Sequence, residues 1–252
     1  DRRSYYAGVT AGFEALSELV RRTHTTTPRY LPLREVYPWV DLHPDGTLRS
    51  VYSGVAFAPE TLIAQDARTA ERRAAEVMLR EATMAPSDLD AFLEATLPYN
   101  CEHAVPQSWF AGREPMRGDL HHLFTCESGC NSFRGNTPYD EFDDLEEVVR
   151  NACGRREAGR FEPVAGKGAV ARATLYVLLR YPDEVSIGEL PADRVPVLLQ
   201  WHAADPPGPW ERHRNQAIYA RQGNRNPFSD HPAWAAKVDF TAAGRHEVIT
   251  LR

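Results

Sequence analysis

The four cysteines of this 252-residue chain all fall within one stretch. They are Cys101, Cys126, Cys130 and Cys153, and we therefore expect the segments around them to lie close together in the fold. An even number of cysteines is typical of two disulfides, or of one zinc ion held by four thiolates. The count alone does not distinguish these arrangements, and either would brace the same part of the chain.

The overall composition is that of an ordinary globular protein, with 42% hydrophobic and 25% charged residues. A formal net charge of −6 argues against a protein that coats nucleic acid through bulk charge, although it leaves room for a local patch that binds a few phosphates. No run of about 18 apolar residues is present, so no membrane-spanning segment is expected. Without an internal repeat or a low-complexity linker, residues 1–252 are expected to form a single domain.

Apolar spacing predicts helices over residues 11–23, 64–83 and 88–97, with Ser87 as the N-cap of the last. Further helices are predicted over residues 143–153, 171–182, 191–203 and 210–223, and Gly223 is expected to end the last of these. Residues 51–53 are predicted to form a short strand. These patterns favour an α+β fold that is mostly helical, with a small β-hairpin that carries a cluster of polar residues.

Three motifs make up that polar cluster. Glu102 and His103 are followed by Pro106. Apolar and polar residues alternate over 119–123, as in a half-buried strand, and polar residues gather over 130–136 at the start of a predicted helix. Strand, loop, strand and helix would form one compact frame. Adjacent strand residues point to opposite faces, so Glu102 and His103 can share a site only where their strand ends or bends.

These residue types suit the hydrolysis of a phosphodiester. A neutral imidazole such as His103 is a suitable base near pH 7. One carboxylate and one amide oxygen, from Glu102 and Asn131, would hold Mg²⁺ without filling its coordination sphere. The guanidinium of Arg134 can donate two parallel hydrogen bonds to a phosphate. The alternative for each residue is structural: a core histidine, a salt-bridge partner, a helix cap or a surface charge.

The segments NCEHAVPQSWF, EPMRGDLHHLF and CNSFRGNTP resemble the bacterial endonuclease I family. These proteins are non-specific, metal-dependent nucleases with the ββα-metal, or His-Me finger, core. The resemblance covers roughly the whole chain, since segments near both ends also resemble the family. It implies a ββα-metal core at about residues 98–145.

The resemblance also implies a role for each motif residue. His103 would activate the attacking water, and Glu102 and Asn131 would bind the catalytic metal. That metal would be Mg²⁺ or another divalent cation such as Mn²⁺ or Ca²⁺. Arg134 would contact the phosphate or the leaving group.

Three further residues are expected to support the site. Asp119 and His121 would orient His103 or line the groove, and Asn136 would have a supporting role. Because His121 and His122 are neighbours in a predicted strand, at least one of them is expected to be structural.

The cysteines depart from the common family pattern, which has no pair at the positions of Cys126 and Cys130. An antiparallel hairpin would bring Cys101 close to these two, with Cys153 returning beside them. Two disulfides and a structural Zn²⁺ both fit, and the clustering of all four cysteines slightly favours zinc.

The function expected from this resemblance is that of a secreted or periplasmic endonuclease, its leader already removed, because the chain begins at Asp1 rather than Met. It would bind DNA, and RNA as well, through phosphates, with no membrane partner; the sequence identifies no protein inhibitor. An alternative is a catalytically inactive, zinc-stabilised nucleic-acid-binding module. A third reading is a toxin-like nuclease domain from a longer chain.

Overall fold

The computed structural model of the chain describes residues 2–144, 146–157, 159–184 and 194–242. Its α-helices are α1 (Arg2–Tyr5), α2 (Phe13–Thr23), α3 (Pro32–Glu35), α4 (Pro59–Arg80), α5 (Pro86–Thr96), α6 (Ser128–Arg134), α7 (Lys167–Arg180), α8 (Val195–Ala204), α9 (Pro209–Gln222) and α10 (Pro227–Asp230). A single π-helical turn, η1 (Val36–Val40), follows α3. Within the described ranges, no helix has the length and apolar character needed to cross a membrane.

The strands of the described residues form three small antiparallel sheets. Strand β1 (Leu48–Arg49) pairs with β2 (Ala56–Phe57), and β3 (Cys101–His103) pairs with β4 (Leu123–Thr125). The third sheet has the order β5 (Val149–Asn151), β6 (Gly154–Glu157) and β7 (Arg160–Pro163). The chain therefore has the predicted α+β fold, mostly helical, and β3, β4 and α6 follow one another as the predicted strand, strand and helix.

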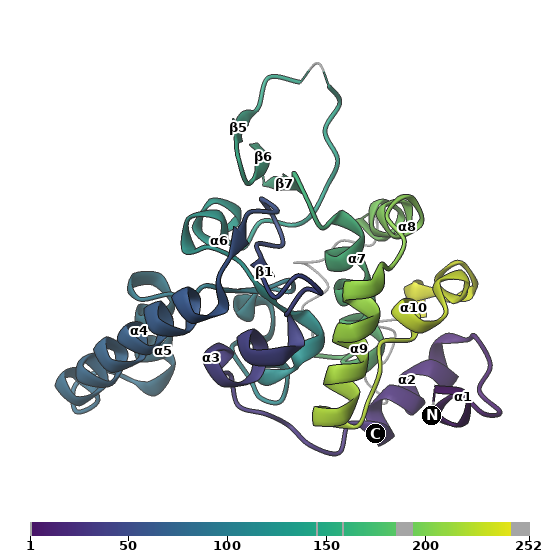
Figure 1. Cartoon of the computed structure of the whole chain (residues 1–252), viewed down its shortest axis with the longest axis horizontal. Coiled ribbons are helices and arrows are strands. Elements are labelled where there is room, and N and C mark those ends of the chain that lie inside the picture. The colour runs from purple at the N-terminus through teal and green to yellow at the C-terminus, as the bar shows by residue number, and fades with distance from the viewer. Residues whose placement is uncertain (1, 145, 158, 185–193, 243–252) are drawn as a thin grey trace, which may run out of the picture.

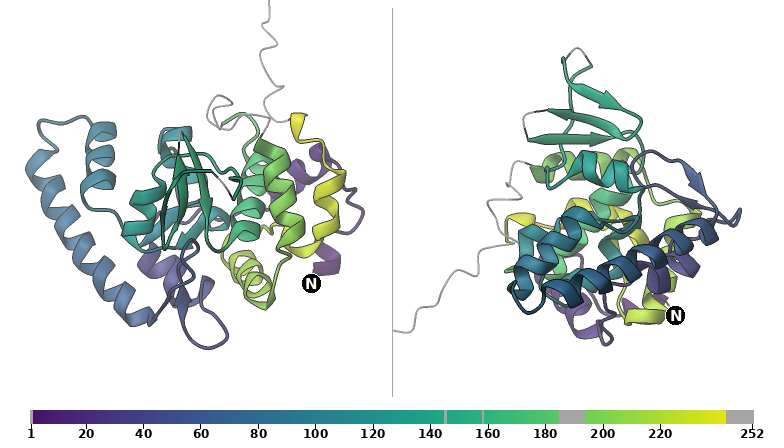
Figure 2. Two further views of the ribbon diagram at one scale, coloured as in Figure 1. Left: turned by 90° about the horizontal axis from the view of Figure 1, so that it is seen from above. Right: turned by 90° about the vertical axis from the view of Figure 1, so that its left-hand side faces the viewer.

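The β3–β4 hairpin lies in the middle of the molecule (Figures 1 and 2). Helices α4 and α5 pack against each other and extend to one side of it. Helices α7 to α10 lie on the other side together with α1 and α2, and the β5–β7 sheet projects from the body at one end. The hairpin thus lies between the α4–α5 pair and a layer of helices drawn mainly from the C-terminal part of the chain.

Helix α7 is the buried centre of the C-terminal layer. Its sequence, KGAVARATLYVLLR, is apolar almost all round, and the side chains from Val170 to Leu179 are buried. A helix that is hydrophobic on every face packs on several sides at once. Helix α7 accordingly contacts α2, α8 and α10, which join it to both ends of the chain.

The predicted C-terminal helix ends as expected at Gly223. This residue has φ +88°, a left-handed conformation that glycine adopts without steric cost. A Cβ atom at this position would also lie 2.6 Å from the carbonyl oxygen of Thr23, so the close approach of α2 requires glycine here as well. The turn after α9 is thereby fixed against the end of α2.

Several local predictions were wrong. Residues 143–153, predicted as a helix, include strand β5, because Val149 to Asn151 pair with β6. Residues 51–53 form a turn, and the strand lies just before them at β1. Ser87 lies inside the first turn of α5, whose N-cap is Ala85. The prediction for 191–203 is confirmed by α8 from Val195 onward, and residues 191–193 lie outside the described part.

Candidate active site

A cleft of about 550 Å³ opens between α5 and the β3–α6 region. The predicted site residues that line it are Glu102, His103, Asn131, Arg134 and Asn136. Strand β3 is three residues long and ends at His103. Although Glu102 and His103 point to opposite faces of the hairpin, the cleft reaches both at the end of this strand. Glu102 and His103 therefore lie where their strand ends, which is the condition under which they can share a site.

The Glu102 carboxylate is buried, and its two oxygens have different surroundings. Oε1 accepts a hydrogen bond of 2.8 Å from Nη1 of Arg134. Oε2 is buried without a hydrogen-bond partner among the described residues. Burial raises the pKa of Glu102 to about 7, opposed by the charge of Arg134 and by the nearby Tyr52 hydroxyl, which makes no hydrogen bond of standard geometry to Oε2. A buried carboxylate oxygen without a partner is unfavourable by itself, and a bound cation would satisfy it.

Asn131 is oriented by the backbone of β3. Its Nδ2 donates a hydrogen bond of 3.0 Å to the carbonyl oxygen of Cys101. This contact fixes which end of the amide carries the oxygen, so Oδ1 is free to act as an acceptor or a ligand. Together, Glu102 Oε2 and Asn131 Oδ1 supply the hard oxygen donors that Mg²⁺ prefers. The residues present therefore fit a divalent cation.

Arg134 is buried behind Glu102, and all three of its nitrogens are engaged. Besides its bond to Glu102, Nη1 donates to His103 O at 3.1 Å, Nη2 donates to Ala104 O at 3.1 Å, and Nε donates to Thr137 O at 3.0 Å. The side chain is 1% exposed. Such a guanidinium has little capacity left for a phosphate. Its contacts instead hold the carboxylate of Glu102 and the end of β3 in place.

His103 is held in one tautomer by a backbone contact. Its Nε2 lies 2.9 Å from the carbonyl oxygen of Arg117. A carbonyl only accepts, so the proton must be on Nε2, and the neutral ring then carries its lone pair on Nδ1. Burial, with a further contribution from His122, lowers the pKa of His103 well below its ordinary value. The imidazole is therefore a neutral base at pH 7.

Asp119 and His121 lie outside this cleft, contrary to the prediction that they orient His103 or line the groove. They do not belong to a strand: Asp119 caps a short 3₁₀ turn that precedes β4, and its side chain accepts from His121 N. The Asp119 carboxylate also binds Tyr176 and Tyr181 of the C-terminal layer. His121 packs its ring against Tyr176, with centroids 4.3 Å apart.

The histidine that faces His103 is His122. The two ring centroids are 5.3 Å apart, and His122 Nε2 bonds to Met116 O at 2.6 Å. His121 was predicted to lie beside His103, and the structure places His122 there instead. The 3₁₀ turn explains this difference, because it rotates successive side chains by about 120° rather than alternating them. Asn136 is exposed at the rim of the cleft, beyond the end of α6.

The cysteines adopt neither of the predicted arrangements. Cys130 and Cys153 form a disulfide, whereas Cys101 and Cys126 are free and buried. In the hairpin Cys101 pairs with Thr125, so Cys126 is one position further on and its side chain lies on the opposite face. The two free thiols therefore cannot meet, which excludes both a second disulfide and a four-thiolate zinc site in this structure.

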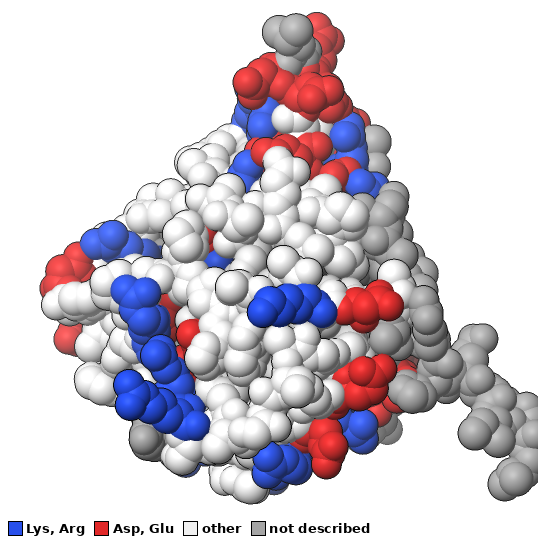
Figure 3. All heavy atoms as spheres, turned by 90° about the vertical axis from the view of Figure 1, so that its right-hand side faces the viewer, with Lys and Arg blue, Asp and Glu red and all other residues white. Residues whose placement is uncertain are grey.

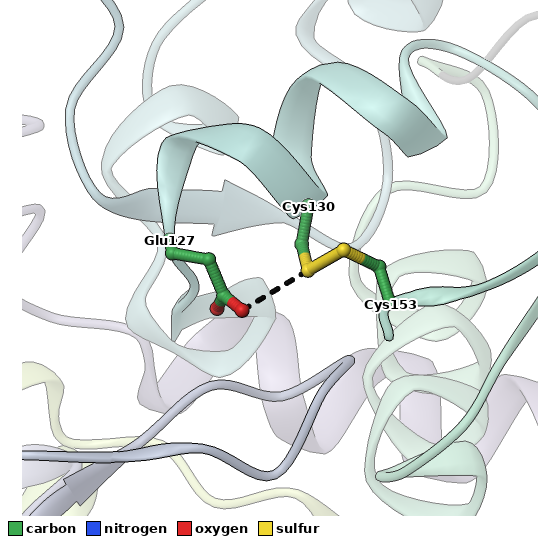
Figure 4. A group of neighbouring side chains, drawn as sticks. All are labelled: Glu127, Cys130 and Cys153. Carbon is green, nitrogen blue, oxygen red and sulfur yellow. Dashed lines mark hydrogen bonds between the residues drawn. A yellow bond between two sulfur atoms is a disulfide. The ribbon is translucent and has the colours of Figure 1, made fainter. Parts of the chain in front are cut away.

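Glu127 lies beside the disulfide, and Figure 4 shows the three side chains. The ligand atoms of Glu127, Cys130 and Cys153 are within 4.8 Å of one another, and Glu127 Oε1 is 3.1 Å from Cys130 Sγ. Zinc binds cysteine as the thiolate, and a sulfur already bonded to another sulfur has no thiolate to offer. The group therefore reads as a disulfide with a neighbouring carboxylate.

Comparison with known proteins agrees with this geometry. The sequence profile of the endonuclease I family matches residues 87–233, more than half of the chain and the whole of the cleft described above. The chain belongs to the endonuclease I family. This membership confirms the resemblance seen in the motifs.

Characterised relatives of this endonuclease I chain include nucleases of both kinds. It is 35% identical to an extracellular ribonuclease of Bacillus subtilis over 156 residues, which are 56% of this chain and 54% of the relative. It is 30% identical to a periplasmic deoxyribonuclease of Aeromonas hydrophila over 121 residues, 45% of this chain and 47% of the relative. The chain thus spans about half the length of the curated relatives it matches.

In this endonuclease I chain the disulfide ties α6 to the β5–β6 turn. We predict that reduction lowers the free energy of unfolding by about 3 kcal/mol, because the bond closes a loop of 23 residues in the unfolded chain. Urea unfolding with and without a dithiol reductant measures the difference. Peptide mapping of alkylated, non-reduced protein should find Cys130 linked to Cys153 and label at Cys101 and Cys126. Linked Cys101, or one zinc per chain, would contradict the structure.

Sequence reasoning missed one arginine of the cleft. Arg117 lies on the 3₁₀ turn Met116–Gly118, and its carbonyl oxygen positions His103 while its side chain lines the cleft. The available signal was a basic residue in the loop that joins the two strands. The turn that carries Arg117 packs closely against the backbone at Pro28, because a Cβ on Gly118 would lie 1.9 Å from Pro28 O. Helix α5, which supplies the facing wall, was not linked to the site at all.

Proposed function

We propose that this chain is a metal-dependent endonuclease that hydrolyses phosphodiester bonds of nucleic acid in the cleft between α5 and α6. The observation that supports this most is the buried, unpartnered oxygen of Glu102, a residue that lines the same cleft as Asn131 and a neutral His103. A purely structural Glu–Arg pair would be expected to use both carboxylate oxygens. Family membership makes nucleic acid the substrate class.

His103 acts as the general base in this proposal. Its Nδ1 lone pair accepts a proton from the attacking water, while Nε2 keeps its proton and donates it in a hydrogen bond to the Arg117 carbonyl oxygen. The hydrogen bond to that carbonyl also stabilises the imidazolium that forms. The low pKa of His103 keeps the free base available at neutral and mildly acidic pH.

Glu102 and Asn131 would hold the divalent cation through Oε2 and Oδ1. Mg²⁺, Mn²⁺ or Ca²⁺ fits this oxygen donor set. When bound, such an ion neutralises charge on the phosphate and stabilises the leaving oxygen. Arg134 is a positioning residue: its hydrogen bonds set the orientation of the Glu102 carboxylate and of the strand end that carries His103.

DNA and RNA are both proposed substrates, since the relatives named above include a ribonuclease and a deoxyribonuclease. On the face shown in Figure 3, basic and acidic side chains are interspersed, and acidic ones gather at the projecting β5–β7 end. Because the net charge of −6 offers nucleic acid no bulk attraction, binding would depend on a few phosphate contacts in the cleft, and activity should fall with added salt. Because those relatives are named extracellular or periplasmic, we also propose that the chain is secreted.

The experiment that tests this function is a cleavage assay on single-stranded DNA, double-stranded DNA and RNA, each with Mg²⁺, Mn²⁺ or EDTA. We expect cleavage with metal and none with EDTA. An inactive nucleic-acid-binding module would bind the same substrates and cut none of them under any metal. That rival also required a four-thiolate zinc site, which the cysteine arrangement does not supply.

Metal binding should depend on pH through Glu102. The ligand is the carboxylate, and in the metal-free protein the pKa of Glu102 is about 7, so a proton competes with the cation below that pH. We predict that affinity for Mn²⁺ falls about fivefold between pH 7 and pH 6, and is nearly constant above pH 8. Titration calorimetry in two buffers of different ionisation enthalpy would also count the released proton. Constant affinity from pH 5.5 to 8 would contradict this ligand assignment.

A further inference from the structure

Arg117 projects into the cleft beside the proposed base. Its Nη1 lies 3.3 Å from Asp90 Oδ2, and its Nη2 lies 3.3 Å from Glu94 Oε1, both on α5. The ring of Tyr30 lies against both Arg117 and His103: its centroid is 5.6 Å from Cζ of Arg117 and 4.6 Å from the ring centroid of His103. The guanidinium is therefore held next to the imidazole and faces the acidic wall of the cleft.

The hydrogen bonds of Arg117 are incomplete. Its Nε is buried without an acceptor among the described residues, and its two contacts of 3.3 Å exceed the usual N–H···O range. Arg134, in contrast, makes four contacts of 2.8 to 3.1 Å with all three nitrogens. Of these two arginines that line the cleft, Arg117 is the one with donors available for an oxyanion.

The two carboxylates that face Arg117 differ in what else they bind. Glu94 also pairs with Arg73 at 2.7 Å, so it keeps a cation if it leaves Arg117. Asp90 is 57% exposed and has no second salt bridge within the described residues. An exposed pair of this kind is weak, and an incoming phosphate can replace it at little cost.

We propose that Arg117 binds a phosphate of the substrate, and that Asp90 and Glu94 compete with that phosphate for the guanidinium. In the free protein the two carboxylates hold the guanidinium of Arg117 in the cleft. A phosphate of the substrate then replaces them as its hydrogen-bond acceptor. Asp90 thereby tunes the affinity of the cleft, because it sets how strongly a phosphate must bind to displace it. This inference rests on the proposed function, since it names the phosphate contact of that same cleft.

The test measures binding alone, on the wild-type protein in EDTA, with a fluorescein-labelled single-stranded oligodeoxynucleotide as the probe. Arg117→Gln removes the guanidinium but keeps the carbonyl that positions His103. Arg113→Gln is its matched control: Arg113 lies in the same loop and pairs with Glu184 at 2.9 Å, but it does not line the cleft. Asp90→Asn removes the competitor, and Asp88→Asn removes an exposed carboxylate of α5 outside the cleft lining.

Arg117→Gln should weaken probe binding about tenfold and reduce the salt slope by about one, whereas Arg113→Gln should change affinity less than about twofold. Asp90→Asn should tighten binding by about two- to fivefold, more than Asp88→Asn does. In the Arg117→Gln background, Asp90→Asn should give no further tightening, because the competition no longer exists.

Two results would overturn the inference: equal affinities for the Arg117 and Arg113 variants, or the same gain from Asp90→Asn with and without Arg117. Asp90→Asn alone changes an exposed position, so its failure to tighten probe binding in the wild-type background would also overturn the inference, however Arg117→Gln folds. Failure of the proposed function looks different. If no metal supports cleavage but the probe follows the expected pattern, the phosphate contact stands and the nuclease activity does not.

Discussion

Replacing His103 by alanine is expected to lower the rate of metal-dependent cleavage by about 10²- to 10⁴-fold, the usual contribution of a general base. The imidazole is neutral because burial lowers its pKa, and the Arg117 carbonyl fixes the proton on Nε2. Both features are lost with the ring, whereas the metal ligands are unchanged. Initial rates on a labelled oligonucleotide at saturating Mg²⁺ measure the effect.

The control for this variant is His213→Ala, which removes a half-buried histidine of α9 that bonds to Trp39 O and does not line the cleft. Its rate should stay within about twofold of the wild type. Added imidazole should partly restore cleavage by the His103 variant, because the deletion leaves space for a free ring. A His103→Ala protein that folds and still cuts at the wild-type rate would exclude this residue as the base.

Replacing Arg134 by methionine is expected to lower the free energy of unfolding by about 3–5 kcal/mol. The guanidinium is buried, and its loss leaves the Glu102 carboxylate and the carbonyl oxygens of His103, Ala104 and Thr137 without their donor. Removing one partner of a buried pair costs more than the pair contributes, because an uncompensated charge is left behind. Urea unfolding monitored by tryptophan fluorescence gives the value.

Arg221→Met is the matched control, since Arg221 pairs with Glu35 at 2.7 Å but is 52% exposed. That change should cost less than about 1 kcal/mol. The Arg134 variant should also be less stable at pH 8 than at pH 5.5. Without Arg134 the folded-state pKa of Glu102 lies still further above its unfolded value, so stability falls as pH rises through that range. Equal costs for the two arginine variants would contradict the buried-pair interpretation.

Helix positions were predictable where the apolar period was long and uninterrupted. Residues 11–23 contain α2, which buries the apolar face that the spacing indicated. Residues 210–223 cover α9 from its second residue onward, but its buried side chains are mostly polar, so apolar spacing alone would not have fixed its orientation. Residues 143–153 were not predictable in this way. Their Glu- and Val-rich sequence is compatible with a helix, but pairing with β6 and the salt bridge between Arg155 and Glu162 place Val149 to Asn151 in a sheet. The partner strand begins at Gly154, directly after the turn, so the local sequence allows either a helix or a hairpin and propensity does not decide between them.

The candidate site could be predicted only in part, because the motif gives its residues but not the contacts that the fold brings to them. Glu102, His103 and Asn131 lie at motif positions, and the structure brings all three to one cleft. The surroundings of Arg134 could not be read from the motif, because its partners are mainly backbone carbonyls. The roles of His121 and His122 depended on a 3₁₀ turn that an alternating pattern does not reveal.

The central claim is that Glu102 and Asn131 hold one divalent cation in the cleft that contains His103. A crystal soaked in Mn²⁺ and measured at the manganese absorption edge tests it most directly. We predict one strong anomalous peak within bonding distance of Glu102 Oε2 and Asn131 Oδ1, and its loss in Glu102→Gln. A peak elsewhere, for example at Glu127, with none at Glu102, would contradict the account.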